Sequence, residues 1–247
     1  MNKWERKFGK YAIPNLTVIL LLCYVVGYVI ELINSSFFSY LTLNPYSIIH
    51  GQIWRLFTWI IIPPSSINIF TLIMLFFYYS IGTTLERTWG TWKYNVYIFS
   101  GILFTIIAAF LCLGVFYLMS ALGNPITLTV RVSQDMGMKM SDISTLFTLG
   151  ASAFSTYYIN LAIYFLYAMT YPEAKVLFMF IIPVKMKWMG IIDLIFLGYE
   201  LLTGNVFTKF VVVAALLNVG LFYLINIRRA SVSPKEIRRR QEFKREV

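Results

Sequence analysis

Long apolar runs constrain this chain more than any other feature of its sequence. Several reach the roughly 20 residues that an α-helix needs to cross a hydrocarbon core of about 30 Å. Their continuous apolarity is unlike the alternation of transmembrane barrel strands, which covers segments of about ten residues. Only 13% of the residues are charged, against about 25% in soluble domains. The sequence therefore predicts an all-α polytopic membrane protein, with six membrane spans at residues 14–33, 67–85, 94–118, 160–171, 188–202 and 206–227.

Basic residues gather at the two ends of the chain. The net charge is +10, and residues 1–10 hold four basic residues and one acidic residue, while residues 228–247 hold eight and three. A basic excess beside apolar spans marks the cytoplasmic side. We therefore expect a cytoplasmic N-terminal basic segment at 1–13, a membrane domain at 14–227 and a basic cytoplasmic tail at 228–247. Both termini then lie inside, most simply at the plasma membrane, with membrane lipids and not nucleic acid as the partner of the charge.

Two loops carry further information. Residues 34–66 include the apolar stretch 56–64, so we expect this first loop to lie in the membrane interface. Residues 119–155 are the least apolar internal stretch and form a large external loop, in which the alternation over 126–133 predicts a short strand. The fourth span has two possible starts. From Ile159 it has only about 13 residues, roughly 20 Å of helix, whereas a start near Ile143 adds a half rich in Ser and Thr that must face protein.

The first loop and the second span carry a recognisable set of residues. A Trp-Arg pair lies in the loop, a Gly-x-x-Leu-Glu motif and a further glycine end the second span, and a late glycine lies in the sixth span. These residues are Trp54, Arg55, Gly82, Leu85, Glu86, Gly90 and Gly220. The pattern, with six spans, resembles the rhomboid and derlin superfamily. The resemblance implies a six-helix rhomboid-like bundle in which these seven residues have structural roles.

Active rhomboids are intramembrane serine proteases, with a Gly-x-Ser serine at the start of the fourth span and a histidine base in the sixth. Matching the late glycines places Val213 at the base position, and counting back from the end of the fourth span places Tyr157 at the serine position. The chain has one histidine, His50. A nucleophilic serine needs a base at neutral pH. The only weak candidates are Ser152, in a Gly-Ala-Ser sequence, and Lys209 as an atypical base.

Three functions follow from this comparison. The first is a catalytically inactive pseudoprotease that binds transmembrane segments or other membrane partners. The second is an active rhomboid serine endopeptidase that uses an atypical base. The third is a small transporter that uses the intramembrane carboxylates Asp193 and Glu200, although no inverted repeat is visible.

Polar residues within the spans give separate expectations. Asp193 lies about 9 Å of helix from Lys187, so we expect a paired structural role for it. Asn160 and Asn218 are expected to form hydrogen bonds between helices. Arg55, flanked by apolar residues, must have partners, and Glu86 either pairs with Arg87 or ties the second span to the first loop.

The chain shows no sign of a metal or cofactor site. The two cysteines, Cys23 and Cys112, lie apart within apolar runs. This placement indicates packed or lipid-facing thiols, not a disulfide or a metal site. We therefore expect no metal and no cofactor.

Overall fold

The computed structural model describes residues 7–124, 126–133, 136–140, 142–178 and 182–230. Within them, five helical segments are long and apolar enough to cross a membrane: Gly9–Ile33, Ile69–Trp89, Thr91–Ala121, Ile143–Thr170 and Val206–Leu224. They correspond to the predicted first, second, third, fourth and sixth spans. The chain is therefore an integral membrane protein with a helical membrane domain. Much of the predicted basic N-terminal segment and tail, residues 1–6 and 231–247, lies outside the described residues.

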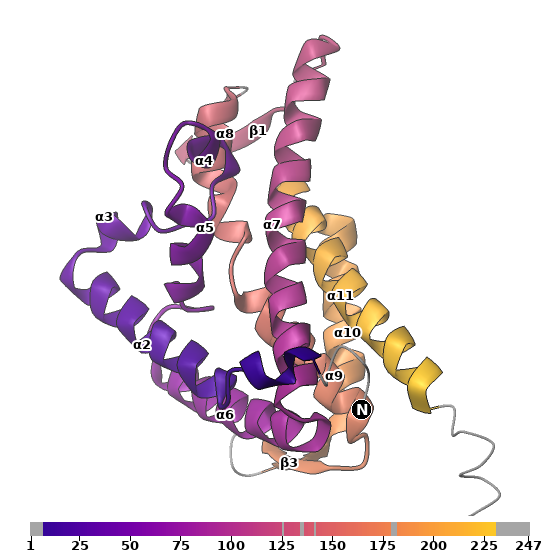
Figure 1. Cartoon of the computed structure of the whole chain (residues 1–247). Coiled ribbons are helices and arrows are strands. Elements are labelled where there is room, and N and C mark those ends of the chain that lie inside the picture. The colour runs from indigo at the N-terminus through magenta and orange to yellow at the C-terminus, as the bar shows by residue number, and fades with distance from the viewer. Residues whose placement is uncertain (1–6, 125, 134–135, 141, 179–181, 231–247) are drawn as a thin grey trace, which may run out of the picture.

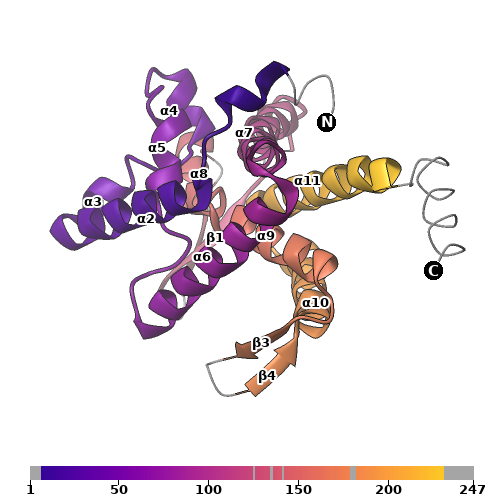
Figure 2. The same cartoon turned by 60° about the horizontal axis from the view of Figure 1, so that its bottom comes forward.

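The helices pack around a central pair (Figure 1). The helix α7 (Thr91–Ala121) runs beside α11 (Val206–Ala230), and α9 (Tyr157–Thr170) packs against both. The helices α2 (Leu16–Ile33) and α6 (Ile69–Trp89) cover the other side, with α6 in contact with α9. Figure 2 shows α9 between α6 and α10 (Met186–Thr203). The fourth predicted span is thus the core of the bundle, as its segment is the most buried of the five.

The fourth segment starts early and is broken. It begins with α8 (Ile143–Gly150), continues through the 3-10 turn η3 (Ala151–Ala153) and resumes as α9. The expectation that the Ser- and Thr-rich half faces protein is wrong in part, because α8 buries Leu146 and Phe147 while Thr148 is exposed. The reason is its place at one end of the bundle beside α4 (Figure 1), where it needs only one apolar face.

The first loop folds into short helical pieces. These are α3 (Ser35–Phe38), α4 (Pro45–Ile49), α5 (Arg55–Thr58) and η2 (Trp59–Ile61). Side chains of Asn34 and Asn44 cap α3 and α4 by accepting hydrogen bonds from backbone N–H groups. η2 packs on α2, and α4 packs on α7 and α8.

Two antiparallel hairpins extend from the helices. The predicted strand is confirmed as β1 (Leu128–Ser133), paired with β2 (Met136–Met140). A second hairpin, β3 (Lys175–Phe178) with β4 (Ile182–Lys185), joins α9 to α10. The sequence analysis missed this hairpin, since its near-continuous apolar run has no strand periodicity and resembles the end of a span.

Candidate functional site

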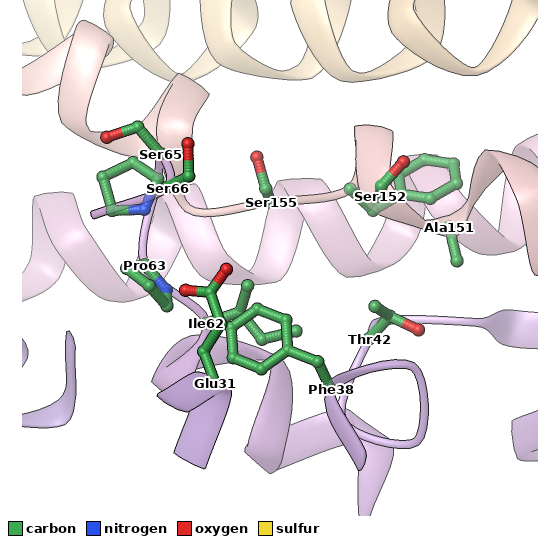
Figure 3. A pocket seen from close by; sticks show the side chains of 12 residues that line it. Glu31, Phe38, Thr42, Ile62, Pro63, Ser65, Ser66, Ala151, Ser152 and Ser155 are labelled. Carbon is green, nitrogen blue, oxygen red and sulfur yellow. The ribbon is translucent and has the colours of Figure 1, made fainter. Parts of the chain in front are cut away.

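A cleft opens between the first loop and the break in the fourth segment (Figure 3). It has a volume of about 210 Å³. We call it the first-loop cleft, and its walls come from the end of α2, the first loop and residues 151–155. The lining residues are Glu31, Phe38, Thr42, Ile62, Pro63, Pro64, Ser65, Ser66, Ala151, Ser152, Phe154 and Ser155. Five of these residues carry hydroxyl groups, and one carries a carboxylate.

Close approach of α2 to the loop shapes the cleft. A Cβ at Gly27 would overlap the carbonyl oxygen of Ile61 and approach the ring of Pro63 to 2.8 Å, so only glycine fits there. Next to it, the Tyr28 hydroxyl donates to the Ser65 carbonyl at 2.9 Å. From the opposite side, the Thr156 hydroxyl donates to the Ile62 carbonyl at 3.0 Å. The Pro63-Pro64 turn is thus held between α2 and the start of α9.

Arg55 organises the outer part of the first loop. It is 5% exposed. Its Nη1 donates to the carbonyl oxygens of Ser39 at 2.7 Å and Thr42 at 3.0 Å, and its Nε donates to Oε1 of Gln52 at 2.6 Å. The prediction that this arginine has partners is confirmed, although the partners are carbonyl, amide and hydroxyl oxygens and no carboxylate. Its neighbour Trp54 is half-exposed and donates from Nε1 to the Tyr40 carbonyl at 3.3 Å.

Ser152 lines the cleft with its hydroxyl free of hydrogen bonds to the described residues. Lys209 does not reach it. On α11, Lys209 follows by two residues Phe207, whose ring packs on Gly150 and Phe154. Two residues turn a helix by about 200°, so Lys209 points away from η3. The structure therefore does not bring the two weak catalytic candidates together.

Three further positions bear on the serine protease hypothesis: the histidine His50 and the two positions that the family resemblance indicates. His50 is exposed at the end of α4, where its Nδ1 lies 2.7 Å from the Tyr46 carbonyl. Val213 is 44% exposed on α11, and Tyr157 begins α9. None of these three side chains forms a hydrogen bond with Ser152.

Glu31 is the residue of the cleft that the sequence analysis missed. It has no hydrogen bond or ion pair within the described residues. Figure 3 shows its carboxylate beside Ile62, on the opposite side of the cleft from Ser152. The sequence could have indicated it, since Glu31 is the only charged residue within the first predicted span.

Most of the remaining motif residues fix the ends of α2 and α6. Glu86 is buried and Oε1 accepts from the backbone N–H of Asn15 at 2.9 Å. Both expectations for Glu86 are wrong, because its carboxylate points across to the start of α2 and not to Arg87 or the first loop. Leu85 is fully buried and Gly82 contacts Thr17, where a Cβ would overlap.

Gly90 and Gly220 behave differently from each other. Gly90 separates α6 from α7 with a φ of 84°, a backbone conformation that favours glycine. Gly220 is exposed, and a Cβ there would meet nothing within 4 Å. Close packing therefore does not require glycine at Gly220.

The intramembrane polar residues divide into satisfied and unsatisfied groups. Asn160 donates to the Tyr24 hydroxyl at 3.0 Å, and Asn218 accepts from the Ser100 hydroxyl at 2.6 Å. Both expected interhelical hydrogen bonds are therefore present. On α10, Glu200 accepts from the Tyr158 hydroxyl at 2.8 Å.

Asp193 is the exception. Its Oδ2 is buried and has no hydrogen-bond partner in the described part of the chain. The expected pairing with Lys187 is wrong, because Lys187 binds Glu173 at 2.9 Å. Lys187 lies in the first turn of α10, and its side chain is partly exposed.

Comparison with protein families gives one match. A family model described as "Eukaryotic integral membrane protein (DUF1751)" matches residues 15–224. No curated protein and no solved structure matches the chain. The matched region contains the first-loop cleft and the five membrane segments except for the first residues of Gly9–Ile33. The description gives the class of protein and no activity.

Proposed function

Since the chain belongs to this family of eukaryotic integral membrane proteins, we propose that it is a rhomboid-like pseudoprotease that binds transmembrane segments of partner proteins without cleaving them. One observation supports the proposal: Ser152 lines the first-loop cleft, and its hydroxyl has no hydrogen bond to a base among the described residues. A serine hydrolase needs a nucleophile, a base and oxyanion donors in contact.

The six-span arrangement is part of the proposal, and it depends on α10 being a membrane span. Its 18 residues give about 27 Å of helix, close to the hydrocarbon thickness. Lys187 and Glu200 lie in its end turns and have partners, so Asp193 is the only charged group left inside. Six crossings place both ends of the chain on one side, which the basic excess assigns to the cytoplasm.

The binding part of the proposal rests on the shape of the fourth segment. The α9 helix has only 14 residues, about 21 Å of length, and the first-loop cleft lies at its start. The 3-10 turn η3 interrupts the segment at this point, and residues of the break line the cleft. In this proposal a partner helix reaches the cleft from the membrane beside the break.

The experiment measures both catalysis by the purified protein and its binding of a transmembrane substrate. We expect the purified protein to give no covalent product with a fluorophosphonate probe and no cleavage of a model transmembrane substrate, yet to crosslink to that substrate in liposomes. Covalent labelling that is abolished by Ser152→Ala and by Lys209→Ala, but not by Ser155→Ala, would contradict the pseudoprotease proposal. It would support an active serine endopeptidase instead. Failure to crosslink any transmembrane segment would remove the binding function.

A further inference from the structure

A carboxylate on α10 has no hydrogen-bond partner among the described residues and interacts with tyrosines of α6 and α9. Asp193 interacts electrostatically with Tyr78 of α6 and with Tyr157 and Tyr164 of α9. We call these four residues the Asp193 cluster. Asp193 Oδ2 and the Tyr164 hydroxyl are both buried and lack a hydrogen-bond partner in the described residues. Two buried polar groups on the neighbouring helices α9 and α10 are thus left without a hydrogen bond.

Tight packing holds α10 against α9 close to Asp193. One turn before it, Gly190 faces Ala168, and a Cβ at Gly190 would lie 2.8 Å from the Cβ of Ala168. The backbone of α10 is therefore held against α9 one turn before Asp193. As a whole, residue Asp193 is only half-buried.

The described residues do not supply Asp193 with a counter-charge. Among the described residues, the only ion pairs join Glu173 to Lys185 and Lys187. Glu200, seven residues along the same helix face, is satisfied by Tyr158. A buried charge without a partner is costly, and more so in lipid. On the same helix, therefore, the carboxylate of Glu200 has a hydrogen-bond donor, whereas the buried oxygen of Asp193 has none.

We propose that the Asp193 cluster recognises a lysine or arginine in the transmembrane helix of a partner protein. This inference deepens the proposed function, on which it rests, by naming the chemistry of the bound segment. A cationic side chain forms an ion pair with Asp193 and leaves the tyrosine hydroxyls to accept its remaining hydrogen bonds. A single basic residue in a span is itself expensive in lipid, so pairing satisfies both proteins at once.

The surroundings fit a helix better than a free ion. Large apolar side chains of α10 are exposed next to Asp193: Ile192 and Phe196. A partner helix covers such a surface, whereas an ion does not. The described residues include no group of three His, Cys, Asp or Glu side chains that could hold a metal ion.

The depth of Asp193 specifies the probe. It lies seven residues after Met186 and ten before Thr203, so about 10 Å and 15 Å from the two helix ends. The probe is a fluorescent Leu-Ala transmembrane peptide with one lysine seven residues from its cytoplasmic end. Its control peptide carries leucine at that position, and binding is measured by energy transfer to the full-length protein in liposomes.

We expect the lysine peptide to bind at least tenfold more tightly than the leucine peptide. Asp193→Asn removes this difference, and Glu200→Gln preserves it. Because Asp193→Asn keeps the size of the side chain, its melting curve is compared with that of the wild type. Asp193→Lys with an aspartate peptide provides a second test, in which the reversed charges restore binding.

The outcomes separate the two proposals. If both peptides bind equally to wild type and Asp193→Asn, the Asp193 cluster is not the recognition site, while the binding function stands. If neither peptide binds, both fail. Uptake of a small cation into the liposomes that depends on Asp193 would replace helix recognition with transport.

Discussion

The carboxylate of Glu86 accepts a hydrogen bond from the backbone N–H of Asn15 across 2.9 Å, joining the last turn of α6 to the first turn of α2. Asn15 has a φ of 54° and no side-chain cap of its own. A negative charge at a helix N-terminus is favourable, so Glu86 supplies the cap that Asn15 does not. This bond fixes the relative position of the first two spans at the same end where Gly82 packs on Thr17.

The first prediction concerns this cap. Glu86→Ala leaves a partly buried N–H without an acceptor and should lower the free energy of unfolding by about 1–3 kcal/mol. Glu86→Gln keeps an acceptor oxygen and should cost less. Thermal melts in detergent measure both, with the exposed Arg87→Ala as the control. A melting temperature for Glu86→Ala equal to that of Arg87→Ala would show that the bond contributes nothing.

The second prediction concerns Arg55. Its removal leaves the carbonyl oxygens of Ser39 and Thr42 without their donor, so Arg55→Ala should destabilise the first loop by about 1–3 kcal/mol. Arg55→Lys should rescue it only in part, because an ammonium lacks the fork that also reaches Gln52. Limited proteolysis within residues 34–66 is the measurement. Equal cleavage rates for Arg55→Ala and Arg87→Ala contradict the prediction.

The third prediction concerns the approach of α2 to the Pro63-Pro64 turn. Gly27→Ala places a Cβ against the Ile61 carbonyl, which is backbone and cannot turn aside, so we expect loss of stability and a change in the first-loop cleft. Gly114→Ala, on α7 with nothing within 4 Å of its Cβ, should be neutral or stabilising by roughly 0.5–1 kcal/mol. The melting temperature of Gly27→Ala should lie below that of the wild type, whereas that of Gly114→Ala should equal or exceed it. Equal melting temperatures for the two variants would mean that the Pro63-Pro64 turn can move to make room for the added Cβ.

The fourth prediction is a pH dependence at the β3–β4 hairpin. Hydrogen bonds from Lys185 and Lys187 lower the pKa of the Glu173 carboxyl from 4.5 to about 2. A lowered folded-state pKa stabilises the fold above the ordinary value, and the effect is lost as the pH falls from about 4.5 towards 2. The stability difference between wild type and Glu173→Gln should therefore be small, constant above about pH 5, and absent near pH 2. A difference that grows as the pH falls reverses the assignment.

The fifth prediction concerns topology. With Cys23 and Cys112 replaced, a cysteine at Ser133 in β1 should react with an impermeant reagent from the outside. A cysteine at Lys175 in β3 should react only from the cytoplasmic side, because the α6 and α9 ends lie together there through the bond between Thr88 and Tyr171. Labelling of both positions from one side would exclude the six-span arrangement.

The sequence by itself determined the class of fold and the position of most spans. Apolar length is a local property, since a helix in lipid satisfies its own backbone hydrogen bonds. The helices α2, α6, α7 and α11 therefore begin and end within a few residues of their predicted limits. The period-2 pattern of β1 is local in the same way. Arg55 was predicted to have partners because an unpaired arginine is costly in or near lipid.

Only the tertiary structure decided which groups meet. The partner of Glu86 is 71 residues away in the chain, and nothing near either residue indicates the other. The break in the fourth segment places Ser152 in a cleft with Glu31, and helix phase turns Lys209 away from both. Asp193 and Glu200 share one face of α10, yet only one finds a hydroxyl. Sequence spacing fixes the face of a helix, whereas the satisfaction of a polar group depends on which neighbouring helix packs there.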